Sequence, residues 1–182
     1  MIIVHMWTDL ISPEAIEAMD RITDAMATSE YECEMEVHAL ANSPALQALY
    51  AAKAQAVDPL AAARAGVAAA RDLTAAHQHG ANISDPAVLA DLSDNLGVDR
   101  DELVAGLADG TWLPPVTTDI EDAHRVHATE PPFVIVGGLF MAAGLKSIDD
   151  YREMVLMAGQ ALGETEAKAR AEINAKRTGP AR

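Results

Sequence analysis

The chain has 182 residues, half of them apolar, with 28 acidic against 13 basic residues and a formal net charge of -15. This length and apolar content suit one globular domain, or one domain with a sizeable insertion. The negative charge repels phosphate backbones and anionic lipid, so we expect no nucleic-acid binding and no binding at a membrane surface. No segment approaches the roughly 20 apolar residues of a membrane span. The N-terminus lacks the basic residues of a signal peptide, so we expect a cytoplasmic protein.

The first third of the sequence predicts a strand, a helix and a second strand. MIIVHMW has the continuous apolar character of a buried central strand. A helix is expected to begin at Ser12-Pro13, because serine is a good N-cap, proline fits the first helical position and the acid Glu14 suits the positive end of the helix dipole. YECEMEVHAL then alternates apolar residues with glutamates, which indicates a half-exposed strand at a sheet edge.

The apolar side of this second strand carries Cys33, the single cysteine of the chain. No intramolecular disulfide, Cys-x-x-Cys pair or cysteine-based zinc site can therefore form. We expect Cys33 to be a buried and inert thiol.

From Asn42 to about Leu113 the pattern is helical throughout, with no strand signal. Pro follows Ser or Asp at each of the first helix starts, and Ser84 and Asp99 are further candidates for N-caps. We interpret residues 43–112 as an inserted helical domain.

Strand signals return with PFVIVGGLFMAAG, which predicts a β-hairpin turning at Gly137-Gly138. A helix capped by Ser147 follows, and its polar tail is expected to fray at Thr178-Gly179-Pro180.

The resulting order is β-α-β, a helical insertion, α, a β-hairpin and α. This is the layout of an α/β thioredoxin fold with about four strands in a mixed sheet. We expect residues 1–42 and 113–182 to form this discontinuous thioredoxin-fold domain.

Three stretches, IVHMWTDLISPEA, ANISDPAVLADLSDNLGVDRDELVAGLADG and TEPPFVIVGGLFMAAGLKSIDDYREMV, carry a resemblance that covers most of residues 2–160. The chain resembles the DsbA-like thioredoxin-fold superfamily, above all its FrnE-type oxidoreductases, with 2-hydroxychromene-2-carboxylate isomerases and kappa-class glutathione transferases further off. Ser12 stands where the resemblance places the nucleophilic cysteine, and Ala15 where it places the resolving one. A hydroxyl cannot replace a thiolate in dithiol exchange. We therefore expect a degenerate redox site without dithiol oxidoreductase activity.

Ser-Pro at this position resembles the working form of the isomerase and kappa-transferase branches. That resemblance implies a catalytic Ser12 that holds the thiol of glutathione or a similar low-molecular-weight thiol. The substrate-binding residues would be Pro13, Glu14, Ala15, Pro131 and Pro132, with Pro132 as the cis-proline of the family.

Two features count against this thiol site. The carboxylate of Glu14 weakens the positive field that a thiolate needs, and Pro131 has no N–H where the family uses one to hold its substrate. Ordinary helix capping by Ser12 is an equally good interpretation.

The histidines suggest little further chemistry. Glu121, His124 and His127 are spaced three apart and could gather ligands on one helix face, but a polar surface is the simpler interpretation, and we predict no metal site. His5 is expected to be a hydrogen-bonded core histidine.

Three functions stay open. The chain is a thiol-dependent transferase or isomerase, a binding or regulatory module for a small molecule or a protein, or a homodimer that buries the old site. The residues around Ser12 differ from the redox motif that the resemblance implies, and this difference favours a degenerate site retained for small-molecule or protein binding.

Overall fold

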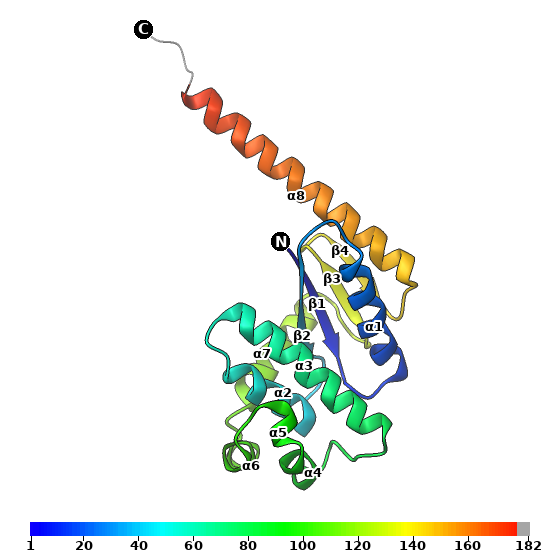
Figure 1. Cartoon of the computed structure of the whole chain (residues 1–182), viewed down its shortest axis with the longest axis vertical. Coiled ribbons are helices and arrows are strands. Elements are labelled where there is room, and N and C mark those ends of the chain that lie inside the picture. The colour runs from blue at the N-terminus through cyan, green and yellow to red at the C-terminus, as the bar shows by residue number, and fades with distance from the viewer. Residues whose placement is uncertain (178–182) are drawn as a thin grey trace.

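The computed structural model of the chain describes residues 1–177 and contains a four-stranded sheet with the strand order β2-β1-β3-β4 (Figure 1). The strands are β1 (Ile2–Thr8), β2 (Cys33–Ala39), β3 (Phe133–Val136) and β4 (Phe140–Ala143). β1 pairs in parallel with β2 and antiparallel with β3, and β3 pairs antiparallel with β4. The predicted α/β thioredoxin-like fold with a mixed sheet is confirmed, and β2 lies at the sheet edge as its glutamates indicated.

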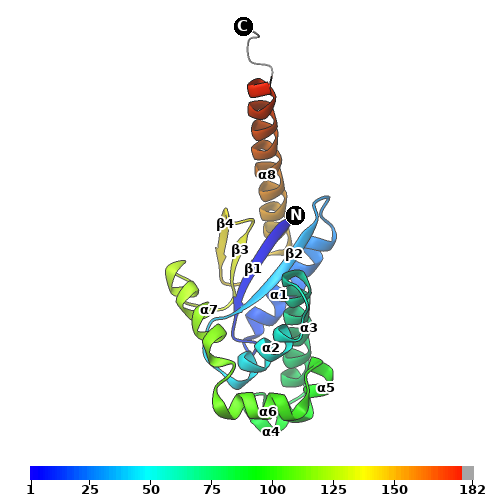
Figure 2. The ribbon, with the colours of Figure 1, turned by 90° about the vertical axis from the view of Figure 1, so that its left-hand side faces the viewer.

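Two helices cover one face of this sheet. α1 (Pro13–Ala27) turns a stripe of small and apolar side chains inward, and α8 (Ile148–Arg177) packs beside it. Within α1 the buried residues are Ala15, Ala18, Met19, Ile22 and Ala25. α8 then runs on well past the sheet, as the two perpendicular views show (Figures 1 and 2).

Six helices connect β2 to β3, where the sequence predicted a helical insertion over residues 43–112 and one further helix after it. They are α2 (Pro44–Ala54), α3 (Pro59–Gln78), α4 (Pro86–Asp91), α5 (Ser93–Leu96), α6 (Arg100–Asp109) and α7 (Leu113–Arg125). Asp99 caps α6 as predicted, with its side chain 3.0 Å from the N–H of Glu102. The prediction that Ser84 is an N-cap is wrong. Asp85 caps α4 instead, 2.9 Å from the N–H of Ala87, because Asp85 is the residue that directly precedes the first helical proline.

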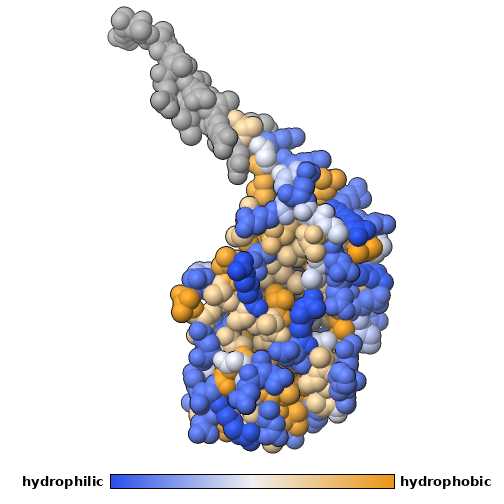
Figure 3. All heavy atoms as spheres, viewed as in Figure 1, coloured by the Kyte–Doolittle hydropathy of each residue, from blue (hydrophilic) through white to orange (hydrophobic). Residues whose placement is uncertain are grey.

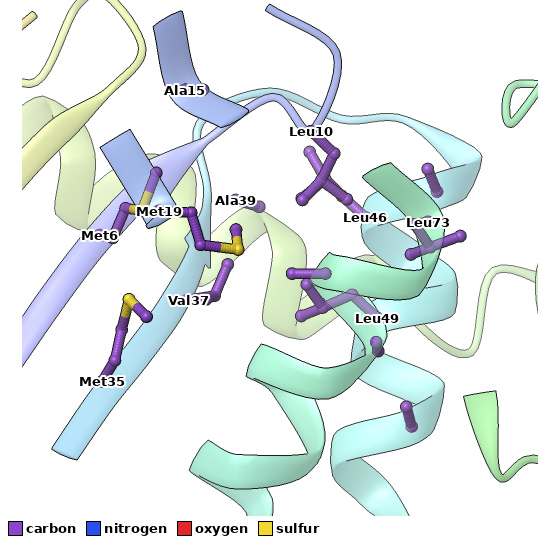
Figure 4. Packing of buried hydrophobic residues seen from close by; sticks show 14 of the residues in the cluster. Met6, Leu10, Ala15, Met19, Met35, Val37, Ala39, Leu46, Leu49 and Leu73 are labelled. Carbon is purple, nitrogen blue, oxygen red and sulfur yellow. The ribbon is translucent and has the colours of Figure 1, made fainter. Parts of the chain in front are cut away.

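The insertion and the sheet share one hydrophobic core. Figure 4 shows side chains from the strands and from α1 meeting those from α2 and α3 across a single interior. Among its labelled residues are Met6, Met19, Met35, Val37, Leu46, Leu49 and Leu73, each at most 3% exposed. The helical segment therefore packs against the sheet through a continuous apolar contact, and its treatment as a separate domain stays a prediction.

The C-terminal elements follow the sequence pattern closely. Val136 pairs with Phe140, so three residues form the turn between β3 and β4. Gly137 and Gly138 adopt φ values of 61° and 71° in it, and the N–H of Leu139 closes it on the carbonyl of Val136 at 3.1 Å. Ser147 caps α8 by accepting the N–H of Asp150 at 3.1 Å. The predicted fraying at 178–180 lies outside the described residues.

Hydrophilic residues surround smaller apolar patches on the face of the molecule that Figure 3 shows. Over the part of the chain that the structure describes, no helix has both the length and the hydrophobicity that crossing a bilayer requires.

Candidate functional site

The first candidate site lies where β1 ends and α1 begins. Ser12 is half-buried there, and its Oγ accepts the N–H of Ala15 at 3.3 Å while its carbonyl accepts the N–H of Ile16 at 3.1 Å. The predicted capping role of Ser12 is thus confirmed. The contact with Ala15 uses the hydroxyl oxygen as an acceptor, so the hydroxyl hydrogen can still be donated to another group.

A second acceptor, which the sequence did not single out, occupies the same helix start. Oδ1 of Asp9 accepts the N–H of Ile11 at 3.2 Å and that of Ser12 at 3.0 Å. Glu14 adds an exposed carboxylate in the first turn of α1. Two carboxylates therefore lie where a bound thiolate would depend on the positive end of the helix dipole, and both weaken that field.

The proline pair precedes β3, the strand next to β1. The Pro131-Pro132 peptide bond is cis, as the resemblance implied. Pro132 is buried, and its carbonyl accepts the N–H of Gly144 at 2.8 Å, which ties it to the end of β4. Among the described residues, Ser12 makes its hydrogen bonds with Asp9 and with its own helix, and none with the proline pair.

Cys33 lies at the other end of the sheet from Ser12. It pairs in register with Ile2 at the beginning of β1, whereas α1 follows the end of β1 at Thr8. Cys33 is half-buried rather than fully buried as predicted, and its Sγ donates to the carbonyl of Tyr31 at 3.3 Å. Burial raises the pKa of the Cys33 thiol, so little nucleophilic thiolate forms at neutral pH.

A hollow of about 370 Å³ borders the start of α1. Its lining combines the apolar residues Ile11 and Ile16 with the acidic residue Glu17 from the α1 side, and His77 from α3. A second hollow of about 270 Å³ continues along the same two helices and shares Ile16 with the first. We call these two hollows together the α1–α3 groove. Its size falls within the range of small-molecule sites.

A polar network that the sequence pattern did not reveal lies on the other face of the sheet. Nδ1 of His38 lies 2.9 Å from Oδ1 of Asp119, and Oδ2 of Asp119 accepts the N–H of Ala39 at 2.7 Å and the hydroxyl of Tyr50. Burial opposes ionisation of Asp119, but these hydrogen bonds, led by that from His38, hold the pKa of its carboxyl below the ordinary value.

His5 joins this network through its contact with His38, 3.0 Å away between ring nitrogens. The prediction that His5 is hydrogen-bonded is confirmed, although its side chain is one-third exposed rather than fully in the core. Strand alternation alone places His38 on the same face as Glu36. Only the register between β1 and β2, which the sequence does not contain, brings His5 next to both.

The histidines of α7 are arranged differently from the prediction. α7 ends at Arg125, and His127 follows it with a φ of 60°, so Glu121, His124 and His127 do not share one helix face. Among the described residues, the group whose ligand atoms gather closely enough for a metal ion is instead His5, Glu36 and His38.

Comparison with known proteins matches this architecture to one family. The DSBA-like thioredoxin domain matches residues 11–155. A search of curated proteins found no relative of the sequence.

Solved structures give the same result at the level of the fold. Oxidoreductase DsbA from Xylella fastidiosa is 17% identical with a TM-score of 0.66, over 89% of this chain and 87% of that one. Reduced DsbA1 from Neisseria meningitidis is 14% identical with a TM-score of 0.65, and the match covers 91% of this chain and 87% of that one. A probable DsbA oxidoreductase from Streptomyces coelicolor is 16% identical with a TM-score of 0.63, and the match covers 88% of this chain and 91% of that one.

Proposed function

Because this chain belongs to the DSBA-like thioredoxin domain family and yet has a single cysteine, we propose that it is a non-redox member that binds a small molecule or a protein segment in the α1–α3 groove. One observation carries the proposal: oxygen acceptors from Ser12 and Asp9 occupy the start of α1. Oxygen groups cannot form the mixed disulfide that dithiol exchange requires. In this proposal Ser12 and Ala15 stand at the two cysteine positions of redox-active relatives.

The lining of the groove favours one chemical class of ligand. Ile11 and Ile16 offer apolar surface, and Ile11 is 48% exposed. Glu17, Asp20 and Asp72 add carboxylates, in a chain whose formal net charge is -15. Arg71 also lines the groove and pairs with Asp20, and Arg21 pairs with Glu17, so the acidic groups outnumber the basic ones by a single charge. A ligand with an apolar body and a cationic or hydrogen-bond-donating group complements this surface, whereas an anionic ligand is repelled.

A second candidate function is a thiol-dependent transferase or isomerase that binds glutathione or a similar thiol at Ser12. It is supported by the half-exposed hydroxyl of Ser12, whose hydrogen can be donated to a thiolate, and by the cis Pro131-Pro132 bond. The carboxylates of Asp9 and Glu14 and the missing N–H of Pro131 oppose it.

Thermal unfolding with millimolar glutathione separates the two functions. A ligand at 100 times its dissociation constant adds about 2.7 kcal/mol of stability. Ser12→Ala and Ser43→Ala form a matched pair, because both serines cap a helix that begins with proline, and each change should cost about 1 kcal/mol. A glutathione-dependent rise that only Ser12→Ala abolishes would establish the thiol site. We expect no rise with glutathione in any of these proteins.

The groove is tested with probes of opposite charge. We expect phenethylamine, but not phenylpropionate, to shift the amide resonances of Ile16 and His77 in a titration followed by NMR. Ile11→Glu should weaken the apolar contact, and Val104→Glu, which changes an exposed residue of α6, serves as the control. Equal shifts with both probes, or shifts outside α1 and α3, would reject the groove. Acceleration of insulin reduction by the wild-type protein would reject the non-redox proposal.

A further inference from the structure

Three side chains with metal-binding atoms meet on the sheet face opposite α1 and away from Ser12. His5 comes from β1, and Glu36 and His38 come from β2. In the parallel pairing of the two strands, His5 is in register with Glu36, and His38 is in register with Trp7. Alternate residues of a strand point to the same face, so the pairing itself brings these side chains together.

Their distances correspond to those between ligands of one ion. Nδ1 of His5 lies 3.0 Å from Nε2 of His38 and 3.3 Å from Oε2 of Glu36, and the third side of the triangle, from Nε2 of His38 to Oε2 of Glu36, is 3.7 Å. Zinc binds imidazole nitrogen and carboxylate oxygen at about 2.0–2.2 Å in tetrahedral geometry, which separates neighbouring ligand atoms by about 3.3–3.5 Å. The triangle can therefore close around a zinc ion with only small movements of the side chains.

Asp119 gives His38 the support that metal-binding histidines generally have. The carboxylate accepts from Nδ1 of His38 at 2.9 Å, so the proton is on Nδ1 and the lone pair of Nε2 faces the triangle. Trp7 stacks on the His38 ring at 4.7 Å between centroids with an angle of 22° between the ring planes. The imidazole is thus fixed in tautomer and in orientation, without the ion.

The triangle is open to solvent on one side. The side chains of His5 and Glu36 are 33% and 35% exposed, so an ion can reach them directly. Glu36 also lines a hollow of about 390 Å³ together with Tyr50, Lys53 and Trp112. Three protein ligands leave a fourth position for water or another ligand, which is the arrangement of open zinc sites rather than closed structural ones.

The nearby cation of Lys53 is already engaged elsewhere. Its Nζ donates to the carbonyl of Val37 at 2.7 Å and lies 4.5 Å from the ring centroid of Tyr50. The carboxylates of Asp119 and Glu36 both act on its charge, so two carboxylates lie near this one ammonium group.

We propose that His5, Glu36 and His38 bind a zinc-like divalent cation, with Asp119 as a positioning residue and a fourth coordination position open to solvent. This site does not depend on the α1–α3 groove or on Ser12, so the proposal stands or fails separately from the proposed function.

The test uses tag-free, full-length protein treated with a chelator and then titrated with Co²⁺ and Zn²⁺. We expect one Co²⁺ per chain, with the strong visible absorption of a tetrahedral site, and its displacement by Zn²⁺. His5→Gln and His38→Gln should each weaken Zn²⁺ binding at least tenfold. His124→Gln is the matched control, because it removes an exposed histidine of α7 and should leave the affinity unchanged. Asp119→Asn should weaken binding by about 10–100-fold, as loss of such supporting contacts does.

A wild-type measurement covers the case in which a variant fails to fold. In histidine ring NMR, Zn²⁺ should shift the nitrogen resonances of His5 and His38 and leave those of His124 in place. Absence of stoichiometric binding, binding that the His5 and His38 variants retain, or ring shifts confined to the other histidines would each overturn the proposal and show that the cluster is a hydrogen-bonded network only.

Discussion

The hydroxyl of Tyr50 donates a hydrogen bond to the carboxylate of Asp119, 69 positions later in the chain. Tyr50 belongs to α2 and Asp119 to α7, so this contact joins the first and the last of the helices between β2 and β3. Asp119 also accepts from His38 and from the backbone of Ala39, which extends the connection to β2. One buried carboxylate therefore connects two helices to the edge strand of the sheet.

Tyr50→Phe removes one donor from this carboxylate and leaves the aromatic ring in place. Hydrogen bonds to charged groups contribute about 1.5–3 kcal/mol, so we expect the free energy of unfolding to fall by about that amount. Tyr151→Phe is the control, because among the described residues the Tyr151 hydroxyl accepts a single long contact, 3.4 Å from the N–H of Lys146, and it should cost clearly less. Urea unfolding of both variants measures the difference, and equal losses would contradict the assignment.

The sequence predicted most of the fold because its signals are local. A Ser or Asp before Pro marks the starts of α1, α2 and α3, and two glycines mark the hairpin between β3 and β4. These signals depend on neighbours in the chain, so they can be interpreted without knowledge of the tertiary structure.

The candidate sites could be predicted only in part, because they depend on contacts between distant segments. Ser12 was identified from its own dipeptide. The cluster of His5, His38 and Asp119 was not identified, since its members are 33 and 81 positions apart and meet only through strand register and the packing of α7 on the sheet. Asp9 was missed for a different reason. In the sequence it resembles an ordinary loop residue, and nothing there shows that its carboxylate accepts the N–H of Ser12.

Introducing two thiols should create redox chemistry at the start of α1. The double variant Ser12→Cys with Ala15→Cys places one thiol at the N-cap of α1 and another in its first turn. Helix geometry puts Cα atoms three residues apart at about 5 Å, within the range of about 4.4–6.8 Å that a disulfide spans. We expect it to form that disulfide with oxidised glutathione and to accelerate insulin reduction, with Ser12→Cys alone as the inactive control.

Asp9 should tune this engineered site. Adding Asp9→Asn to the double variant removes a carboxylate from the positive end of the helix, so the introduced thiol should have a lower pKa and the disulfide should be more oxidising. The equilibrium with glutathione measures this change. An unchanged equilibrium would mean that the carboxylate of Asp9 does not act on the helix start electrostatically.

The cap of α8 makes a prediction about pH. Hydrogen bonds from the hydroxyl of Ser147, at 2.7 Å, and from its N–H, at 3.0 Å, lower the pKa of the Asp150 carboxyl. Since the folded-state pKa is below the unfolded one, this contact stabilises the protein above the unfolded pKa of about 3.9. The contribution is lost as the pH falls through the folded-state pKa.

Ser147→Ala removes the stronger of these donors, so the pKa of Asp150 should rise in a titration of carboxyl carbons by NMR. Asp109 provides an internal control, because its pKa is lowered by Thr111 instead and should stay the same in this variant. If the pKa of Asp150 does not change in this variant, a group other than the Ser147 hydroxyl lowers it.

Two glycines of α8 should respond in opposite directions to the same substitution. A Cβ at Gly159 would lie 2.3 Å from ring atoms of Tyr31, whereas a Cβ at Gly163 would meet no heavy atom of another described element within 4 Å. Gly163→Ala should therefore gain the helix propensity of alanine, about 0.5–1 kcal/mol. Gly159→Ala gains the same propensity but forces the Tyr31 ring to move, and overpacking of this kind costs about 1–3 kcal/mol. Thermal unfolding of the two variants should thus show a higher Tm for Gly163→Ala and a lower one for Gly159→Ala.

Adding Tyr31→Ala tests the cause of this difference. It should remove the loss of stability caused by Gly159→Ala and leave the gain from Gly163→Ala unchanged. If Gly159→Ala still destabilises the protein without the Tyr31 ring, α8 does not pack on Tyr31 as the structure has it.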